Sequence, residues 1–225
     1  DYETLYDITD AQQEDPQFIF NVTMQNHSSY AQGWNNLEKT ITLPETQRAA
    51  DTTAEQYLSL IRESDAALAD LIGHYSQSEE PTMVVFFGDH QPPLKNAFYE
   101  LLYGKKLSER TTQEVLKQYA TPFFIWTNYD IQEQEDVVIS PNFLGVLTAQ
   151  LAGLPLTGYM NFLTQLYEEL PVITPVGLIT AQGECLTEKE LSAEQQELLA
   201  TYEILNYCGM VDLFEEARPM YCLDE

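Results

Sequence analysis

The sequence predicts an α/β fold in which helices flank a largely parallel sheet. The first observation is a set of short apolar runs rich in β-branched and aromatic residues, at 18–24, 82–87 and 122–127, each followed by a polar loop. The second is an amphipathic helical pattern from about residue 54 to 76. Strands that alternate with amphipathic helices build layered α/β domains. We expect the three runs to be neighbouring strands of one sheet, with this helix packed on it.

The length of 225 residues and the absence of a clear linker predict a single domain over residues 1–225. Three strands are few for the core of a sheet, and the chain opens on the polar residues Asp1-Tyr-Glu-Thr. We therefore expect it to be a portion of a longer protein.

Composition excludes several classes of function. There are 36 acidic and 10 basic residues, a formal net charge of −26, so phosphate backbones would be repelled and nucleic-acid binding is not expected. An anionic membrane surface would repel most of this chain too. Such acidity favours a soluble chain. No apolar run reaches about 18 residues, so we expect no membrane span.

The stretch around residue 89 is the strongest candidate site. The apolar run ends at Gly88, which tolerates close approach by other groups. Asp89 and His90 follow directly, and a pair of prolines then ends the strand. Ligands of open α/β sheets gather beyond the carboxyl ends of the strands. Carboxylate and imidazole are both metal ligands, so Asp89 and His90 predict a metal-binding corner.

A second histidine follows the first predicted strand. His27 comes just after residues 18–24. Parallel strands end at the same edge of a sheet, so His27 is expected to converge with Asp89 and His90 to within roughly 10 Å. A loop histidine bonded to backbone is an equally good interpretation of His27 on local sequence alone.

The rest of the chain contains residues that predict where helices start and end. Thr53 to Gln56 has the pattern of a capping box at the start of the 54–76 helix, and His74 lies off its apolar stripe, without a chemical role. Ser140-Pro141 predicts a helix start and Gly153 a helix stop. Further expectations are two short helices within 95–118, an edge strand at 137–139, a helix over 159–170, short strands at 172–173 and 178–179, and a helix over 192–207.

The basic residues Lys105, Lys106 and Arg110 form the most basic patch of this acidic chain. Such a patch is usually solvated surface, and here it is also suited to an anionic substrate.

The cysteines Cys185, Cys208 and Cys222 leave at least one thiol unpaired. A Cys208–Cys222 disulfide fits an oxidising compartment, whereas buried or idle thiols are the more frequent case.

Three motifs in order resemble one family. They are Phe20-Asn-Val-Thr-Met-Gln-Asn-His27, Phe87-Gly-Asp-His-Gln-Pro92 and Thr121-Pro-Phe-Phe-Ile-Trp126. Together they are similar to the C-terminal part of the catalytic domain of lipoteichoic acid synthase-like phosphoglycerol transferases, in the sulfatase and alkaline phosphatase superfamily. The likeness is clearest over residues 16–170, and 171–225 reads as a mostly helical C-terminal extension.

The resemblance implies a membrane-anchored parent enzyme whose catalytic domain faces the outside of a bacterial cell. Such enzymes move glycerol phosphate from phosphatidylglycerol, an anionic glycerophospholipid, to a polymer or glycolipid acceptor. The resemblance assigns a divalent metal, typically Mn²⁺ with Mg²⁺ or Zn²⁺ as alternatives, to Asp89 and His90, and assigns His27 to the phosphate or leaving group.

One departure from the family pattern concerns the nucleophile. The family's threonine nucleophile and a glutamate ligand lie well upstream of the Asn-His motif, and Thr4 and Thr9 lack that context. The 225 residues are therefore expected to be inactive alone. Two alternatives stay open: a sulfatase or phosphatase of the same superfamily, and a non-catalytic extracellular interaction domain on this fold.

Overall fold

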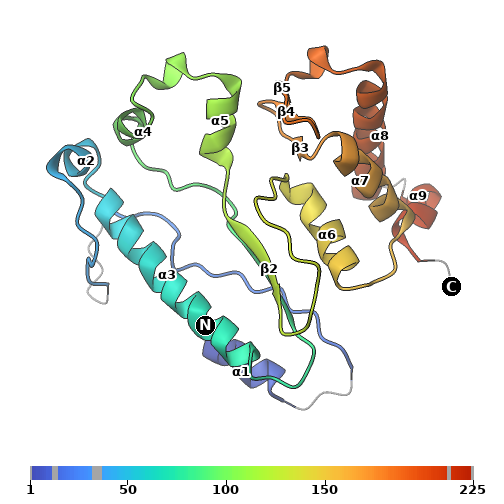
Figure 1. Cartoon of the computed structure of the whole chain (residues 1–225), viewed down its shortest axis with the longest axis horizontal. Helices are drawn as coiled ribbons and strands as arrows, with labels where there is room; N and C mark the ends of the chain where they lie inside the picture. The colour runs from blue at the N-terminus through green and yellow to red at the C-terminus, as the bar shows by residue number, and fades with distance from the viewer. Residues whose placement is uncertain (1, 12–14, 32–36, 212–213, 224–225) are drawn as a thin grey trace. The chain divides into compact units, whose positions relative to one another are not determined.

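The computed structural model describes residues 2–11, 15–31, 37–211 and 214–223. The chain forms two compact units (Figure 1). Unit 1 comprises Asp1–Thr82 and His90–Glu109, and unit 2 comprises Met83–Asp89 and Arg110–Glu225. The chain passes between the units at three peptide bonds, and one of them joins Asp89 to His90.

Unit 1 is helical in its described residues. Its elements are α1 (Tyr2–Thr9), α2 (Glu45–Ala50), α3 (Ala54–Tyr75), α4 (Asn96–Tyr103) and the 3₁₀ helix η1 (Leu107–Glu109).

Unit 2 combines helices with two small sheets. Its elements are β1 (Met83–Phe87), α5 (Thr112–Tyr119), β2 (Phe123–Thr127), η2 (Pro141–Phe143), α6 (Leu144–Leu151), α7 (Gly158–Glu169), β3 (Val172–Ile173), β4 (Leu178–Ile179), β5 (Cys185–Leu186), η3 (Glu188–Glu190), α8 (Ala193–Met210) and α9 (Phe214–Tyr221). The predicted α/β class and most of the predicted helices are confirmed.

The predicted strand direction is wrong for the strands that the structure describes. β1 pairs with β2 antiparallel, with Val85 opposite Ile125, and β3, β4 and β5 form a second antiparallel sheet. Apolar strand composition indicates burial but carries no information on direction, which the connection between strands decides. The end of β1 therefore lies beside the beginning of β2.

The predicted strand at 18–24 is also wrong. Residues 16–24 have no strand assignment, and no described strand pairs with them. Phe18 is 90% exposed and Phe20 is 67% exposed. Strand propensity measures how well side chains fit a sheet that is present, not a preference of the isolated backbone, so composition alone did not make this segment a strand.

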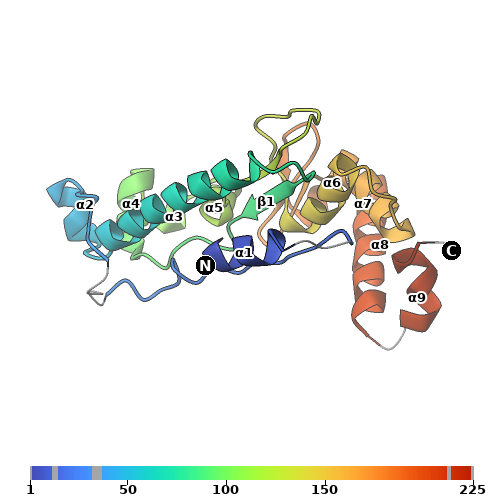
Figure 2. The same cartoon turned by 90° about the horizontal axis from the view of Figure 1, so that it is seen from below.

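α3 is the long element of unit 1, and α1 lies beside its C-terminal end (Figures 1 and 2). The Tyr6 ring stacks on His74 with centroids 3.9 Å apart, and His74 Nε2 lies 3.1 Å from Asp10 Oδ1. Thr9 Oγ1 lies 3.0 Å from the Tyr75 hydroxyl. His74 is thus occupied in packing α1 against α3, in line with its having no chemical role.

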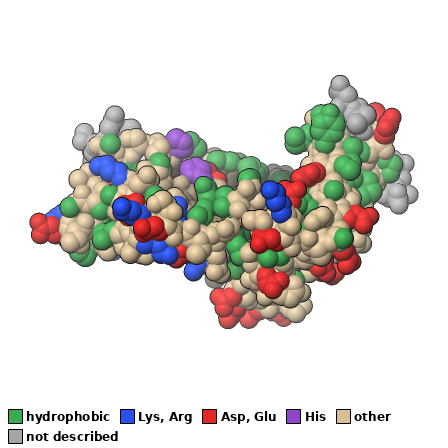
Figure 3. Space-filling model, turned by 90° about the horizontal axis from the view of Figure 1, so that it is seen from above, with side chains coloured by type: hydrophobic (Ala, Val, Ile, Leu, Met, Phe, Trp, Pro, Cys, Tyr) green, Lys and Arg blue, Asp and Glu red, His purple; other side chains and the backbone are tan. Residues whose placement is uncertain are grey.

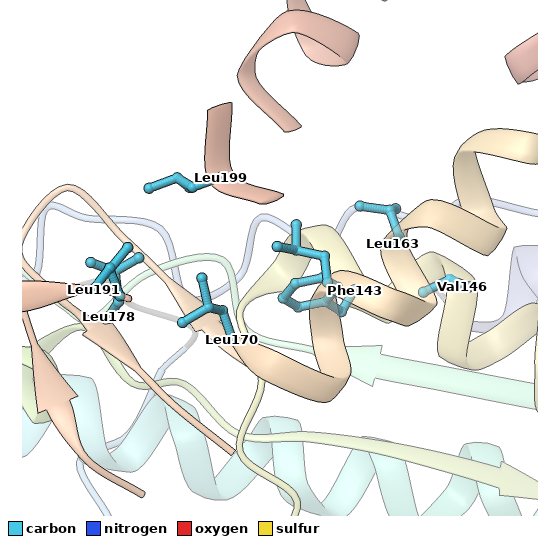
Figure 4. Close-up of a cluster of buried hydrophobic side chains, with 8 residues drawn as sticks. Phe143, Val146, Leu163, Leu170, Leu178, Leu191 and Leu199 are labelled. Carbon is cyan, nitrogen blue, oxygen red and sulfur yellow. The ribbon is translucent and has the colours of Figure 1, made fainter. Parts of the chain in front are cut away.

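Unit 2 has the larger apolar core. Figure 4 shows side chains from α6, α7, β4 and α8 converging on Phe143 and Leu170. Leu166 and Leu170 are fully buried, and Phe143 is 1% exposed. The buried members are Phe143, Val146, Leu163, Leu166, Leu170, Leu178, Leu191 and Leu199.

Residues 137–139 do not form the predicted edge strand. Ile139 packs against the apolar core. The side chain of the following Ser140 makes no helix-cap hydrogen bond, and Ser140 instead hydrogen-bonds the backbone at β3. Its backbone N–H donates to Pro171 O at 2.9 Å, and its hydroxyl accepts from Ile173 N–H at 3.0 Å. The helix start at Pro141 and the stop at Gly153, whose φ is +67°, are as predicted.

The three cysteines are all free thiols, so the Cys208–Cys222 disulfide is absent. In the part of the chain that the structure describes, no helix combines the length and the hydropathy needed to cross a membrane.

Candidate functional site

Asp89 follows β1, and the backbone just before it contacts the residues that precede β2. Gly88 N–H donates to Pro122 O at 3.0 Å, and the Thr121 hydroxyl donates to Gly88 O at 2.8 Å. A Cβ at Gly88 would lie 3.1 Å from the Thr121 Cβ, so glycine permits this approach, as the sequence predicted. The backbone before Asp89 is therefore fixed, while the Asp89 side chain is exposed.

His90 begins the second segment of unit 1, and its tautomer follows from one contact. His90 Nδ1 lies 2.9 Å from Gln91 O. A carbonyl oxygen only accepts, so Nδ1 carries the proton and donates it, which places the lone pair of the neutral ring on Nε2. Metal-binding histidines generally present one ring nitrogen in this way while the other N–H is held by a carbonyl or carboxylate.

The loop after His90 is held at two points by unit 1. The Tyr99 hydroxyl donates to Pro92 O at 2.6 Å. Lys95 N–H donates to Asp51 Oδ2 at 2.6 Å. Leu94 between them is buried with Ala54 of α3. These contacts fix the loop through one carbonyl, one backbone N–H and one apolar side chain.

Asp51 is a buried carboxylate that joins this loop to the start of α3. It is 1% exposed, and its Oδ1 accepts from Thr53 N–H at 2.8 Å and from the Thr53 hydroxyl at 2.6 Å. Burial acts to raise the pKa of Asp51, but the hydrogen bonds from Thr53 and Lys95 and the charge of Lys95 outweigh it, so the pKa is lowered.

Asp51 also explains why the predicted capping box is wrong. A capping box needs the Gln56 side chain to accept from Thr53 N–H, and Asp51 already accepts there. Thr53 makes no side-chain cap hydrogen bond, and Gln56 is buried instead.

His27 sits on a tight turn that is tied to α3. His27 N–H donates to Met24 O at 3.1 Å, and the preceding Asn26 exchanges hydrogen bonds with the Ser64 hydroxyl of α3 at 2.9 and 3.1 Å. The Tyr30 hydroxyl donates to Asn26 O at 2.6 Å. The turn is therefore held from both its side-chain and its carbonyl groups.

The His27 ring has the same tautomer as His90. His27 Nδ1 lies 2.7 Å from Ser28 O, so it donates, and the lone pair of the neutral ring is on Nε2. Among the described residues Nε2 has no hydrogen-bond partner, and the side chain is exposed. The interpretation of His27 as a loop histidine bonded to backbone is therefore correct for Nδ1 and leaves Nε2 available for chemistry.

The predicted residues are divided between the two units. All three histidines belong to unit 1, and Figure 3 shows two histidine side chains close together on one face. Asp89 belongs to unit 2. The convergence of His27 with Asp89 therefore stays a prediction.

The donor atoms of Asp89 and His90 match only part of what the divalent metal implied by the resemblance requires. Asp89 and His90 supply an oxygen and a nitrogen, which fit a divalent cation in kind. The described residues contain no group of three or more His, Cys, Asp or Glu side chains able to hold one. A catalytic metal site usually has three protein ligands, so Asp89 and His90 fit part of such a site.

The basic patch is also divided between the units. Lys105 and Lys106 follow α4 in unit 1, where Gly104 with a φ of +66° ends the helix. Arg110 lies in unit 2 and donates to Gln118. Its role beside an anionic substrate stays a prediction.

A cavity of about 350 Å³ lies in unit 2. It is lined by β2 residues such as Phe123, by Gln132 and Gln134 of the following loop, and by Leu147 of α6. None of the predicted site residues lines it.

Sequence reasoning missed Asp51, Tyr30 and Tyr99. An Asp two residues before a helix N-cap is a signal for local side-chain hydrogen bonds, and it stands in the sequence Asp51-Thr-Thr-Ala. No sequence motif marks the two tyrosines, because their bonds to Asn26 O and Pro92 O depend on how the turn and the loop fold.

Comparison with known proteins agrees with the fold. Residues 2–154 match the sulfatase family. The chain belongs to the sulfatase family. A solved structure of Streptococcus pyogenes phosphoglycerol transferase GacH in complex with sn-glycerol-1-phosphate superposes with a TM-score of 0.57 and 21% identity, over 88% of this chain and 46% of that one. This likeness confirms the expected sulfatase-like α/β fold.

Two relatives from Rhizobium meliloti (strain 1021) match the sequence. A protein named for cyclic beta-1,2-glucan modification is 27% identical over 200 residues, which are 86% of this chain and 31% of that protein. The capsular polysaccharide biosynthesis protein RkpI is 33% identical over 84 residues, which are 37% of this chain and 13% of that protein. The chain thus spans less than a third of the length of either relative.

Proposed function

We propose that the protein carrying this chain is a metal-assisted phosphoglycerol transferase that moves glycerol phosphate from an anionic glycerophospholipid to a glycan or glycolipid acceptor of the cell envelope. The observation that carries the proposal is that a chain of the sulfatase family contains both the Asp89-His90 pair and an Asn-His turn whose imidazole keeps Nε2 available. The named activity of GacH supports the donor chemistry. The named roles of the two relatives in glucan and capsular polysaccharide pathways support a glycan acceptor.

Asp89 and His90 are proposed to hold the metal, together with ligands from elsewhere in the protein. A bound divalent cation would neutralise phosphoryl oxygens and lower the pKa of an attacking hydroxyl. Asp89 contributes a hard anionic oxygen, and His90 contributes Nε2 while its Nδ1–H is held by Gln91 O. Manganese is the metal that the family resemblance favours.

His27 is proposed to give a proton to the departing alkoxide. In the transfer, the phosphorus–oxygen bond to diacylglycerol breaks, and the electron pair stays on the leaving oxygen. Because Nδ1–H is engaged with Ser28 O, the proton to be transferred is carried on Nε2 of the cationic ring. The turn is fixed by Asn26 and Ser64, so the ring approaches the substrate from a defined place.

The nucleophile is proposed to come from a part of the protein outside these 225 residues. The Thr9 hydroxyl is engaged with Tyr75 and with Tyr6 O in packing α1, and Thr4 lies on the exposed side of α1. We expect the isolated chain to bind Mn²⁺ weakly and to leave phosphatidylglycerol intact.

The test compares the full-length protein with four variants. Asp89→Ala and His90→Ala should abolish both turnover of phosphatidylglycerol and calorimetric Mn²⁺ binding. His27→Ala should lower turnover ~10²-fold or more and leave Mn²⁺ binding intact. His74→Gln is the matched control, since His74 is engaged with Asp10 and should leave turnover within about twofold.

Other outcomes discriminate the alternatives. Hydrolysis of sulfate or phosphate monoesters without transfer to an acceptor would identify a sulfatase or phosphatase. If the Asp89→Ala and His90→Ala variants kept full turnover, Asp89 and His90 would have a structural role and not a catalytic one. Absence of both Mn²⁺ binding and turnover would leave a non-catalytic interaction domain.

A further inference from the structure

The two histidine-bearing segments of unit 1 are held by the same small apolar cluster. We call it the anchor cluster: its buried members are Ala54, Leu94 and Phe98, with Tyr30, Leu43, Ala50, Tyr57 and Tyr99 packed against them. Tyr30 belongs to the segment that follows His27. Leu94 and Tyr99 belong to the segment that follows His90. Ala54 and Tyr57 are the first turn of α3, on which both segments rest.

Each segment is fixed by one tyrosine hydroxyl that bonds a backbone carbonyl next to its histidine. Tyr30 donates to the carbonyl of Asn26, the residue before His27, at 2.6 Å. Tyr99 donates to the carbonyl of Pro92, two residues after His90, at 2.6 Å. Both contacts are short and part-buried, and their geometry requires the phenol to be protonated.

The state of Tyr99 supports this role. Burial first, and then neighbouring Tyr57, raise the pKa of Tyr99, while a backbone hydrogen bond from Leu94 acts in the opposite direction. The phenol therefore stays protonated and donates throughout the physiological range.

A third tyrosine, Tyr57, packs against the same cluster. Tyr30 and Tyr57 have ring centroids 5.4 Å apart at an interplanar angle of 56°. Tyr99 packs against the same buried members of the cluster, and the neighbouring Tyr57 contributes to its raised pKa. The segments that follow His27 and His90 thus share one apolar cluster of unit 1, against which Tyr30, Tyr57 and Tyr99 all pack.

We infer that Tyr30 and Tyr99 are positioning residues that set where His27 and His90 stand relative to each other. The inference rests on the proposed function for its effect on turnover, but the loop geometry it describes does not depend on any reaction. Neither tyrosine touches substrate or metal in this role; each acts through the backbone of a histidine segment. Misplacement of a catalytic group by about 1 Å can cost ~10²-fold in rate, so the loss of one such bond should be measurable.

The variants remove hydroxyls and keep the rings. Tyr30→Phe and Tyr99→Phe each delete one carbonyl hydrogen bond. Tyr57→Phe is the matched control, because it lies in the same cluster and its hydroxyl makes no hydrogen bond among the described residues. All three preserve the packing of the cluster, so differences among them report on the hydrogen bonds of the Tyr30 and Tyr99 hydroxyls, which for Tyr99 include the one from Leu94.

The first readout needs neither metal nor substrate. Amide hydrogen exchange of the full-length protein should speed up ~10-fold over 24–30 in Tyr30→Phe and over 90–96 in Tyr99→Phe, with Tyr57→Phe like the wild type. Exchange in both loops equal to that of Tyr57→Phe would overturn the inference, whatever the protein's activity.

The second readout separates the two histidines. Mn²⁺ affinity should fall ~10-fold in Tyr99→Phe and stay unchanged in Tyr30→Phe, because the first positions a proposed ligand and the second a proposed proton donor. kcat should fall ~10-fold in Tyr30→Phe with KM unchanged. Faster loop exchange without these functional changes would refute the assigned roles in positioning. A wild-type protein without Mn²⁺ binding or turnover would instead refute the proposed function, and the exchange result would still decide whether the tyrosines hold the loops.

Discussion

Each of the two units of this chain is stabilised internally by a different kind of contact. Unit 2 is built around eight buried apolar side chains, and its buried polar residues are Ser140 and Thr180. Unit 1 has a buried apolar cluster of three, beside which four polar residues are buried: Asp51, Glu55, Gln56 and Ser59. Leu60, Leu71 and Tyr75 are also buried in unit 1, but among the described residues its buried set is richer in polar side chains than that of unit 2.

This difference follows from what each unit has to do. An apolar core stabilises a fold without specifying the place of an exposed loop, because burial is non-directional. A loop that carries an exposed histidine has few side chains to bury, and its backbone is placed by bonds to individual carbonyl and amide groups. Asp51, Ser59, Tyr30 and Tyr99 make such bonds in unit 1.

The largest effect is expected in the apolar core of unit 2. Leu166→Ala removes a fully buried side chain and should lower the free energy of unfolding of unit 2 by about 3–4 kcal/mol. Urea denaturation with hydrogen exchange as the probe locates the loss. Leu102→Ala, at a residue 58% exposed in unit 1, is the control and should change stability by less than about 0.5 kcal/mol. A loss below about 1 kcal/mol at Leu166 would contradict the assignment of the core.

Asp51→Asn should destabilise unit 1 by about 2–3 kcal/mol at pH 7, because a buried backbone N–H loses an anionic acceptor. The pKa of Asp51 is lowered on folding, so its ionisation stabilises the fold above the unfolded pKa, and this contribution is lost as pH falls through the folded value. The difference between wild type and variant should therefore shrink below about pH 4. Denaturation curves at pH 7, 4 and 3 measure it, and a difference independent of pH would refute the role of the charge.

Ser59→Ala is expected to cost about 1–2 kcal/mol. The buried Ser59 hydroxyl accepts from Thr40 N–H at 3.0 Å and from Ile41 N–H at 3.1 Å, and it donates to Glu55 O at 2.7 Å. Hydrogen exchange should accelerate at residues 40 and 41. Ser76→Ala, at an exposed hydroxyl, is the control. Equal effects of the two substitutions would show that the segment before α2 is held by something else.

The smallest loss of stability is expected for a single hydrogen bond in unit 2. Ser192 caps α8, where its side chain accepts from Gln195 N–H at 3.2 Å in a capping box, at the place where the sequence predicted the helix to start. Ser192→Ala should cost about 1 kcal/mol. Thr201→Ala, in the middle of the same helix, should be close to neutral. A thermal melt of each variant is sufficient, and a larger loss from Thr201→Ala would rule out the cap as the relevant contact.

Local sequence predicted elements well where one segment decides them. The helix at α3, the cap of α8, the stop at Gly153 and the strand that ends at Gly88 each depend on residues close together in the chain. The candidate residues Asp89, His90 and His27 were found for the same reason, because their motifs are contiguous.

Prediction failed where a partner from far along the chain decides the outcome. Residues 18–24 have strand composition, but no described strand pairs with them. The direction of β1 against β2 is set by the connection that includes α4 and α5, not by either strand. The capping box at Thr53 is a local exception, because Asp51, two residues earlier, accepts from Thr53 N–H, although Asp51 itself is also bonded to Lys95 of a distant loop.

By itself, the sequence determined the α/β class, the family motifs and the chemical identity of the candidate site. These depend on composition and on short-range spacing, which survive in a linear chain. Only the tertiary structure decided the antiparallel pairing, the Nδ1–H tautomers of His27 and His90, and the tyrosine hydroxyls that hold their segments. The physical reason is that a hydrogen bond needs both partners within about 3 Å, and folding alone brings residues as distant in sequence as Asp51 and Lys95 to that separation.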